Sequence, residues 1–166
     1  LAKHVHPASA GEAAVLRTVS EILRDPGVRV AGLTMAISQV VMVMLMVITS
    51  LHMSHHHHQL SSIAAVMSSH VFGMYAFSVV SGRFADKWGR GPLIGVGALV
   101  LVVSCLTATL STEVAPLAFA LFLLGLGWNF SFVAASAELA DRTHARERGK
   151  LFGFSDQLGA FVGAAL

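Results

Sequence analysis

Long apolar runs separated by short polar segments dominate the chain. They cover residues 28–51, 60–81, 92–111, 116–137 and 150–166. The first four each hold about 20 residues, which as a helix span about 30 Å, the thickness of the hydrocarbon core of a bilayer. From Val30 to Ser81 there is no Asp, Glu, Lys or Arg. The pattern therefore predicts four membrane-spanning helices and part of a fifth.

The composition agrees with this pattern. Hydrophobic residues make up 55% of the chain and charged residues 12%, and the mean hydropathy is +0.71. Soluble domains carry about 25% charged residues, so this chain could not cover its surface with groups that face water. The expected fold class is an all-α integral membrane helix bundle. The formal net charge of +2 is too small to suggest a nucleic-acid partner.

The basic residues are distributed unevenly along the chain. All 11 Lys and Arg lie around the start of the first run, between the second and third runs, or between the fourth and fifth. The other two loops contain none. Because Lys and Arg accumulate in cytoplasmic loops, residues 1–27, 82–91 and 138–149 are predicted to be cytoplasmic. We expect a multi-pass protein of the plasma membrane.

The N-terminal segment differs from the rest in being polar. Residues 1–27 are predicted to form a linker, in which apolar residues over 12–24 follow the spacing of an amphipathic helix. A solvated linker with some helicity is the alternative. No initiator Met opens the chain and the fifth apolar run stops at Leu166, so we interpret the sequence as a fragment cut at both ends.

A histidine-rich segment, His52 to His58, lies between the first two runs. Imidazoles bind metals, so one alternative is a membrane-embedded metalloenzyme that uses this cluster. The cluster stands alone and falls on the predicted outer side, which favours a polar loop instead. We expect neither a metal site nor a cofactor, and no enzymatic activity.

Five polar residues fall inside the predicted spans: Gln39, His70, Asn129, Asp156 and Gln157. Polar groups in hydrocarbon need partners and commonly line cavities or carry protons. Imidazole also titrates near physiological pH. These residues are candidates for a substrate cavity or for proton coupling, and hydrogen bonding between helices is the alternative. Met35, Met42, Met44 and Met46 give the first span a flexible apolar face that suits varied hydrophobic shapes.

Glycines recur in the later runs at spacings that allow close helix packing. They are Gly95, Gly97, Gly125, Gly127, and the pairs Gly149/Gly153 and Gly159/Gly163. We expect helices to approach one another closely at these positions.

The charged stretch between the second and third runs reads Gly-Arg-Phe-Ala-Asp-Lys-Trp-Gly-Arg, residues 82–90. Its pattern resembles the cytoplasmic signature loop of the major facilitator superfamily. The matching residues are Gly82, Asp86, Lys87, Gly89 and Arg90. Gly91 stands where a second basic residue is usual, and Lys87 where Arg is commoner. The basic segment from Ala140, which leads into a glycine-rich helix, resembles the next cytoplasmic loop of that family.

This resemblance implies a secondary transporter of small molecules that works by alternating access between two six-helix halves. The chain would be most of the C-terminal half, and its partners would be the missing N-terminal half, the lipid bilayer, a small-molecule substrate and protons. The methionine face slightly favours efflux of hydrophobic, drug-like compounds, as by a proton-coupled antiporter. A non-transporting membrane scaffold remains an alternative.

The resemblance also implies a conformational gate built from Gly82, Arg83, Asp86, Lys87, Gly89 and Arg90. Asp86 is expected near the positive N-terminal end of the fifth helix, around Arg148. Arg90 is expected to pair with Glu138 or Asp141, and Arg142 is a further possible partner. Such contacts would close the cytoplasmic side and favour an outward-open state.

Overall fold

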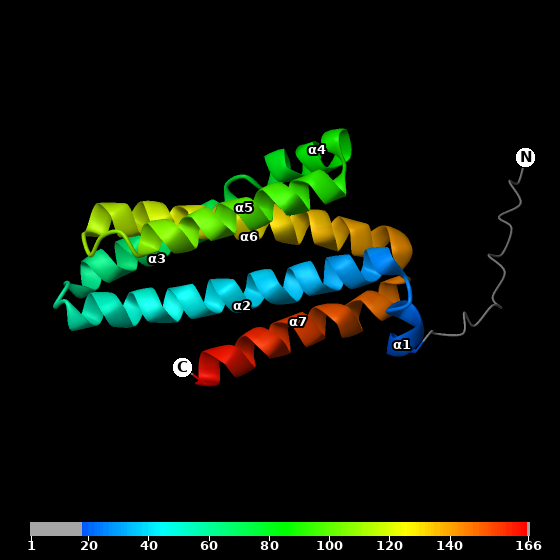
Figure 1. Ribbon diagram of the computed structural model, residues 1–166, viewed down its shortest axis with the longest axis horizontal. Coiled ribbons are helices and arrows are strands. Elements are labelled where there is room, and N and C mark those ends of the chain that lie inside the picture. The colour runs from blue at the N-terminus through cyan, green and yellow to red at the C-terminus, as the bar shows by residue number, and fades with distance from the viewer. Residues whose placement is uncertain (1–17, 166) are drawn as a thin grey trace, which may run out of the picture.

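The protein is a bundle of long helices (Figure 1). The computed structural model describes residues 18–165, apart from the side chains and surroundings of residues 19, 145, 146, 151, 155, 158, 159 and 163. The elements are α1 (Val19–Ile22), α2 (Pro26–His55), α3 (Leu60–Tyr75), α4 (Ser78–Trp88), α5 (Arg90–Ala108), α6 (Val114–Arg142) and α7 (Ala145–Ala165). The described residues contain helices and no strands, which confirms the all-α fold class.

Four segments of the described chain are long and apolar enough to cross a membrane. They are Pro26–His55, Leu60–Trp88, Arg90–Ala108 and Val114–Arg142. The second comprises α3 and α4 together. The helix α7 runs beside α2 as a further long element (Figure 1).

The two ends of the bundle differ in chemistry. α2 and α7 begin, and α4 and α6 end, at the same end of the long axis (Figure 1). Every Lys and Arg side chain that the structure describes lies there, so we call it the basic end. At the opposite end, residues 56–59 connect α2 to α3 and residues 109–113 connect α5 to α6. We call it the histidine end.

α6 is the central helix and packs against α2, α3 and α5. Half of its apolar window is buried, against 22% for each of the other three spans. Its buried face consists largely of small and aliphatic residues. They include Leu117, Ala120, Leu121, Leu124, Ala134, Ala135 and Leu139.

Glycines allow α3 and α5 to approach α6 closely. A Cβ at Gly125 would lie 2.8 Å from the backbone nitrogen of Met74 in α3. A Cβ at Gly127 would lie 2.9 Å from the backbone nitrogen of Leu101 in α5, and Gly97 is packed as tightly against α6. The expected close packing is confirmed at these positions. At Gly95, Gly149 and Gly153 no described residue comes within 4 Å of an added Cβ, so the described part of the chain shows no close packing there. The surroundings of Gly159 and Gly163 lie outside the described part of the structure.

The helices extend further than the apolar runs. α2 reaches His55, α6 continues to Arg142, and α7 starts at Ala145, so most of the expected loop 138–149 is helical. A charged residue does not end a helix by itself. The helix continues past the apolar run because its polar last turns still form the backbone hydrogen bonds of a helix. The one break inside an expected span lies at Ala76–Phe77, between α3 and α4.

Residues 1–17, which include the first half of the expected amphipathic helix, lie outside the described residues. The described remainder forms the short α1. The carboxylate of Glu21 accepts hydrogen bonds from the backbone and hydroxyl of Thr18 (2.7 and 2.8 Å), which resembles a capping box. Ile22 is fully buried against a cluster that contains Val28 and Leu139. α1 is therefore packed onto the bundle at the basic end.

Candidate functional site

The signature stretch 82–90 is mostly helical, which corrects the expected hairpin loop. α4 continues through Trp88, and α5 starts at Arg90. Gly89 alone turns the chain, with φ 87° and ψ 161°. This backbone region is open essentially only to glycine. Gly89 is therefore a conformational requirement of the turn, whereas a Cβ at Gly82 would meet open space.

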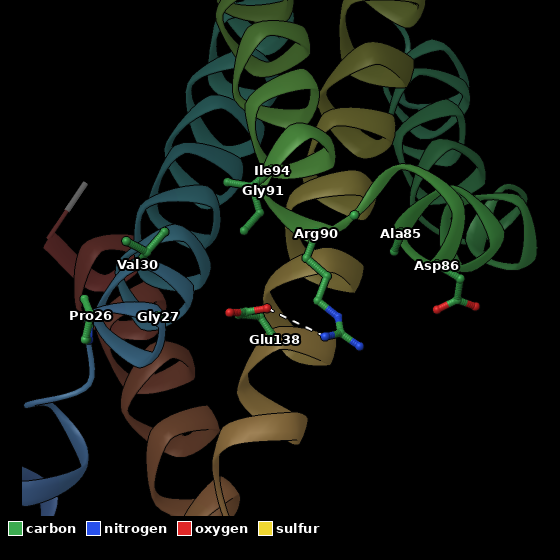
Figure 2. A pocket seen from close by; sticks show the side chains of 10 residues that line it. Pro26, Gly27, Val30, Ala85, Asp86, Arg90, Gly91, Ile94 and Glu138 are labelled. Atoms are coloured by element: carbon green, nitrogen blue, oxygen red, sulfur yellow. Dashed lines mark ion pairs between the residues drawn. The ribbon is translucent and has the colours of Figure 1, made fainter.

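Five charged side chains form an ion network at the basic end. Arg90, at the start of α5, pairs with Asp141 and with Glu138, whose Oε2 lies 3.7 Å from Nη1 (Figure 2). Arg142 donates from Nε to Oε1 of Glu138 (2.6 Å) and from Nη1 to Oδ1 of Asp25 (3.1 Å). The ion network (Asp25, Arg90, Glu138, Asp141, Arg142) thus ties the start of α2 and the start of α5 to the end of α6.

The network is neither buried nor fully hydrated. The side chains of Arg90 and Glu138 are 31% and 20% exposed. Exposed single pairs contribute little because solvent screens them. Here each central residue serves two partners, so one ordered side chain supports two pairs. Such a network stabilises one arrangement of three helices and can be released when they move.

Asp25 is the member of this network that sequence reasoning missed. It is the N-cap of α2, and its Oδ1 accepts the backbone N–H of Gly27 at 2.8 Å. Pro26 at the first helical position fits this geometry. Asp25-Pro26-Gly27 was readable as a helix start as well as a break in the preceding segment. Its long-range partner Arg142, 117 residues away, was not readable.

Partial burial raises the pKa of Asp25, but hydrogen bonds from Gly27 and Arg142 outweigh it, so the pKa lies below its ordinary value. A carboxyl with a lowered folded-state pKa stabilises the fold above its unfolded pKa of about 3.9, and this contribution is lost as pH falls through the folded pKa.

We expect Asp25→Asn to lower the melting temperature of the detergent-solubilised protein at pH 7, because the cap keeps an acceptor but loses its charge. The difference from the unsubstituted protein should shrink as pH falls below about 3.9 and disappear only below the lowered folded-state pKa of Asp25, where both side chains are neutral. Asp86→Asn is the control, since this exposed carboxylate has no partner among the described residues. A pH-independent effect of Asp25→Asn would show that charge is not involved.

A cavity of about 560 Å³ opens beside the ion network (Figure 2). Its walls come from the first turns of α2, the end of α4, the start of α5 and the end of α6. The lining residues are Pro26, Gly27, Val30, Ala85, Asp86, Gly89, Arg90, Gly91, Ile94 and Glu138. The Arg90 side chain projects towards Glu138, with Asp86 on its other side (Figure 2). The cavity places the signature stretch directly against the ion network.

Asp86 does not lie where the sequence placed it. It lines this cavity, to which α7 contributes no described residue. α4 and α7 lie on opposite sides of the bundle (Figure 1), which explains why Asp86 does not meet the start of α7. Asp86, Arg83 and Lys87 are exposed and make no hydrogen bond or ion pair within residues 18–165.

Arg148, the other expected gating partner, closes the turn between α6 and α7. Its guanidinium donates to the backbone carbonyls of Ala140 (2.5 Å) and Thr143 (3.2 Å). Glu147 accepts the backbone N–H of His144 at 3.0 Å, which completes the start of α7 in the manner of a capping box. Arg148 thus stabilises the turn between α6 and α7 through hydrogen bonds to nearby backbone carbonyls.

Asn129 lies in the bundle interior at the break between α3 and α4. Its amide nitrogen donates to the carbonyl of Met74 (2.6 Å) and to Oγ of Ser78 (2.9 Å). Its amide oxygen accepts from the hydroxyl of Ser81. Carbonyls in the last turn of a helix lack a helical N–H partner, and the Asn129 amide supplies a donor for the carbonyl of Met74. The geometry favours hydrogen bonding between helices over cavity lining for this residue.

Gln39 of α2 meets an aromatic cluster that sequence reasoning did not single out. Its Oε1 accepts from Nε1 of Trp128 at 3.1 Å. The Trp128 ring stacks on Phe132, with centroids 4.5 Å apart and an interplanar angle of 14°, and Phe132 lies 6.0 Å from Phe152 of α7. All three rings of the aromatic cluster (Trp128, Phe132, Phe152) are half-buried. The i, i+4 spacing of Trp128 and Phe132 was the available signal.

His70 is fully buried where α3 crosses α6. Its Nδ1 lies 3.2 Å from the carbonyl oxygen of Leu121. A carbonyl only accepts, so Nδ1 carries a proton, and in the neutral imidazole Nε2 then holds a lone pair. Nε2 has no partner among the described residues. A buried imidazole with one free lone pair is a group that a proton or a hydrogen-bond donor can still engage.

The remaining polar candidates are not gathered into one site. Asp156 and Gln157 are exposed on α7 and have no partner among the side chains described. Gln39 faces α6, and Asn129 faces the α3–α4 break. Within residues 18–165, the five polar residues of the spans therefore lie in separate environments.

The histidine cluster is spread over the end of α2 and the following turn. Nε2 of His58 donates to the carbonyl of Thr112 (2.9 Å) and so ties the two loops of the histidine end together. No group of three His, Cys, Asp or Glu residues in the described part is placed to hold a metal ion. The geometry gives the metalloenzyme alternative no support.

Comparison with known proteins places these features in a family. The family model of the Major Facilitator Superfamily matches residues 30–166. The uncharacterized MFS-type transporter YddS of Bacillus subtilis (strain 168) is 37% identical over 141 residues, 84% of this chain and 32% of YddS. The riboflavin transporter RfnT of Brucella anthropi is 30% identical over 140 residues, 84% of this chain and 35% of RfnT.

A shorter match joins the chain to the multidrug resistance protein MdtL of Klebsiella pneumoniae (strain 342), 32% identical over 84 residues, 51% of this chain and 21% of MdtL. No solved structure matches the chain. The chain spans about a third of the length of YddS and RfnT. Four apolar spans and the family match over residues 30–166 show that this integral, multi-pass membrane chain belongs to the major facilitator superfamily of transporters.

Proposed function

We propose that the transporter containing this chain moves small molecules across the plasma membrane by alternating access, with the basic end in the cytoplasm and the chain acting as most of its C-terminal half. The observation that carries this proposal is the ion network, which joins three helices at one end of the bundle by contacts that solvent can replace. The accumulation of Lys and Arg at that end supports its cytoplasmic orientation.

In this proposal the ion network and the signature stretch form the inner gate. Arg90 holds the start of α5 against α6, while Gly89 fixes the turn that presents Arg90. Asp86 has no partner within residues 18–165 and lies on the wall of the 560 Å³ cavity. A group from the other half could pair with it when the cytoplasmic side closes. Gly82, Arg83 and Lys87 surround this contact on α4.

For the cargo we propose small, amphipathic molecules with aromatic rings. The aromatic cluster offers stacking surfaces, and Gln39 beside it offers an amide. Met42 and Met46 on α2 add adaptable apolar surface. Two relatives are named for riboflavin transport and for multidrug resistance, which agrees with such cargo. Export of hydrophobic compounds is the favoured direction.

For the driving force we propose coupling to protons, with His70 as the first candidate and Asp156 as the second. The support is the free lone pair on the buried Nε2 of His70. Reconstituted in vesicles, the full-length protein should accumulate cargo only when a pH gradient is imposed. His70→Ala should uncouple the cargo from that gradient, and coupling that survived loss of both His70 and Asp156 would refute these assignments.

Trp128→Ala in the full-length protein should raise KM for an aromatic cargo about fivefold, because one aromatic stack contributes about 1 kcal/mol. The turnover rate should change less. Phe119→Ala is the matched control, since Phe119 is an exposed ring on the same helix outside the aromatic cluster. An equal rise in KM for both substitutions would assign the effect to general destabilisation. A transport screen that found no transported compound would favour the scaffold alternative.

A further inference from the structure

A groove of about 460 Å³ separates α2 from α7 at the basic end, beside α1. It lies apart from the ion network, the 560 Å³ cavity and the signature stretch. α2 contributes Arg29, Gly32, Leu33 and Ala36, and α7 contributes Lys150 and Phe154. We call it the α2–α7 groove.

Polarity changes with depth in the same way on both walls. Arg29 lies three residues, or about 4.5 Å, from the start of α2, and Lys150 five residues, or about 7.5 Å, from the start of α7. Leu33 and Phe154 each follow their cation by four residues and so lie one turn deeper on the same face. Each wall therefore presents a cation near the start of its helix and apolar surface one turn deeper in the bundle.

Within the described part of the chain, the two cations of the groove have no partner and its apolar residues are not covered. Arg29 and Lys150 are exposed and make no hydrogen bond or ion pair there, in contrast to Arg90 and Arg142. Below them, Leu33 is 61% and Phe154 64% exposed. Two like charges that share a groove favour an anion between them. The apolar floor favours a hydrocarbon chain.

We infer that the α2–α7 groove binds an anionic phospholipid of the surrounding bilayer. Its phosphate pairs with Arg29 and Lys150, and an acyl chain lies along Gly32, Leu33 and Phe154. Basic pockets between membrane helices on the cytoplasmic side are suited to anionic headgroups. This site requires neither a transported cargo nor an operating gate, so it stands independently of the proposed function.

Native mass spectrometry of the full-length protein, released from bilayers of phosphatidylcholine and phosphatidylglycerol, tests the charge requirement. The protein should retain phosphatidylglycerol in preference to phosphatidylcholine. Arg29→Gln and Lys150→Gln should each weaken this retention about fivefold, since one cation near the surface contributes about 1 kcal/mol. Arg24→Gln removes the same charge from an exposed site at the same end, outside the groove, and should leave retention unchanged.

A second pair of variants tests the groove with all its charges intact. A Cβ at Gly32 or at Gly95 would meet nothing within 4 Å, so both sites accept a larger side chain. Gly32→Leu fills the groove and should displace the lipid, whereas Gly95→Leu lies on α5 and should not. Equal losses for Arg24→Gln and Arg29→Gln would overturn the inference. Full retention of phosphatidylglycerol by Gly32→Leu would also overturn it, because the lipid would then bind elsewhere, as expected if another helix covers the groove. Displacement of the lipid by glycerol phosphate alone would overturn it as well, because the acyl chain would then contribute nothing.

Discussion

Gly125→Val should abolish most of the folded protein, because α3 has no room to accommodate a side chain at this crossing. The added Cβ would meet the carbonyl oxygen of His70, the nitrogen of Met74 at 2.8 Å and the carbonyl carbon of Gly73 at 3.1 Å. All three are backbone atoms, which a change of rotamer cannot move. Overpacking of this kind costs about 1–3 kcal/mol and occasionally more.

The cost should be at the upper end of that range, because separating α3 from α6 also breaks partly buried hydrogen bonds between these helices. Oγ of Ser69 donates to the carbonyl of Ala118 at 2.8 Å, and Asn129 holds the carbonyl of Met74 at 2.6 Å. The measurements are the monodisperse fraction after detergent extraction and the melting temperature of what remains. Gly95→Val, where the new side chain meets open space, is the matched control. A Gly125→Val protein with the same melting temperature as the Gly95→Val control would refute the packing argument.

Arg90→Gln should open the basic end without unfolding the protein. The substitution removes two partly exposed ion pairs, to Asp141 and Glu138. At about 0.7 kcal/mol each, after allowance for solvent screening, they amount to a tenfold shift between closed and open states. The two carboxylates left behind also repel each other. Transport by the full-length protein should fall about tenfold.

The accompanying conformational change can be measured directly. Gly91→Cys places a thiol on the cavity wall, and its labelling by a membrane-impermeant maleimide from the cytoplasmic side should accelerate in the Arg90→Gln background. Arg90→Lys should restore part of the closed state, since it keeps the positive charge but not the guanidinium that pairs with both Glu138 and Asp141. Arg24→Gln is the control for loss of charge alone. Unchanged labelling together with reduced transport would mean that Arg90 acts elsewhere in the cycle.

Some contacts between helices could be predicted from the order of residues along the chain. Arg90 begins a helix at the basic end, and Glu138 and Asp141 end another there, so opposite charges at the same depth were expected to meet. They do, as the ion pairs show. Asp86 lies at the same depth as the start of α7, but α4 and α7 lie on opposite sides of the bundle (Figure 1). Depth along the membrane normal follows from the sequence, whereas neighbourhood around the bundle does not.

The same distinction separates the polar residues of the spans. The sequence showed that Gln39 and Asn129 need partners, because an amide in hydrocarbon is costly to leave unpaired. It did not show that Gln39 meets Trp128 or that Asn129 meets the α3–α4 break. Those partners depend on how each helix is rotated about its axis, which the close crossings at Gly125 and Gly127 set.

By itself the sequence determined the helical membrane architecture, the basic end and the resemblance to the family. Each follows from composition and order along the chain, because a helix needs about 20 mainly apolar residues to cross the hydrocarbon core and basic residues accumulate on one side of the membrane. The tertiary structure alone decided that the signature stretch is helical up to Gly89, that Asp25 caps α2 within the ion network, and that an α2–α7 groove exists. The ion network and the groove depend on distances between residues far apart in the chain, which only the packing of the helices fixes.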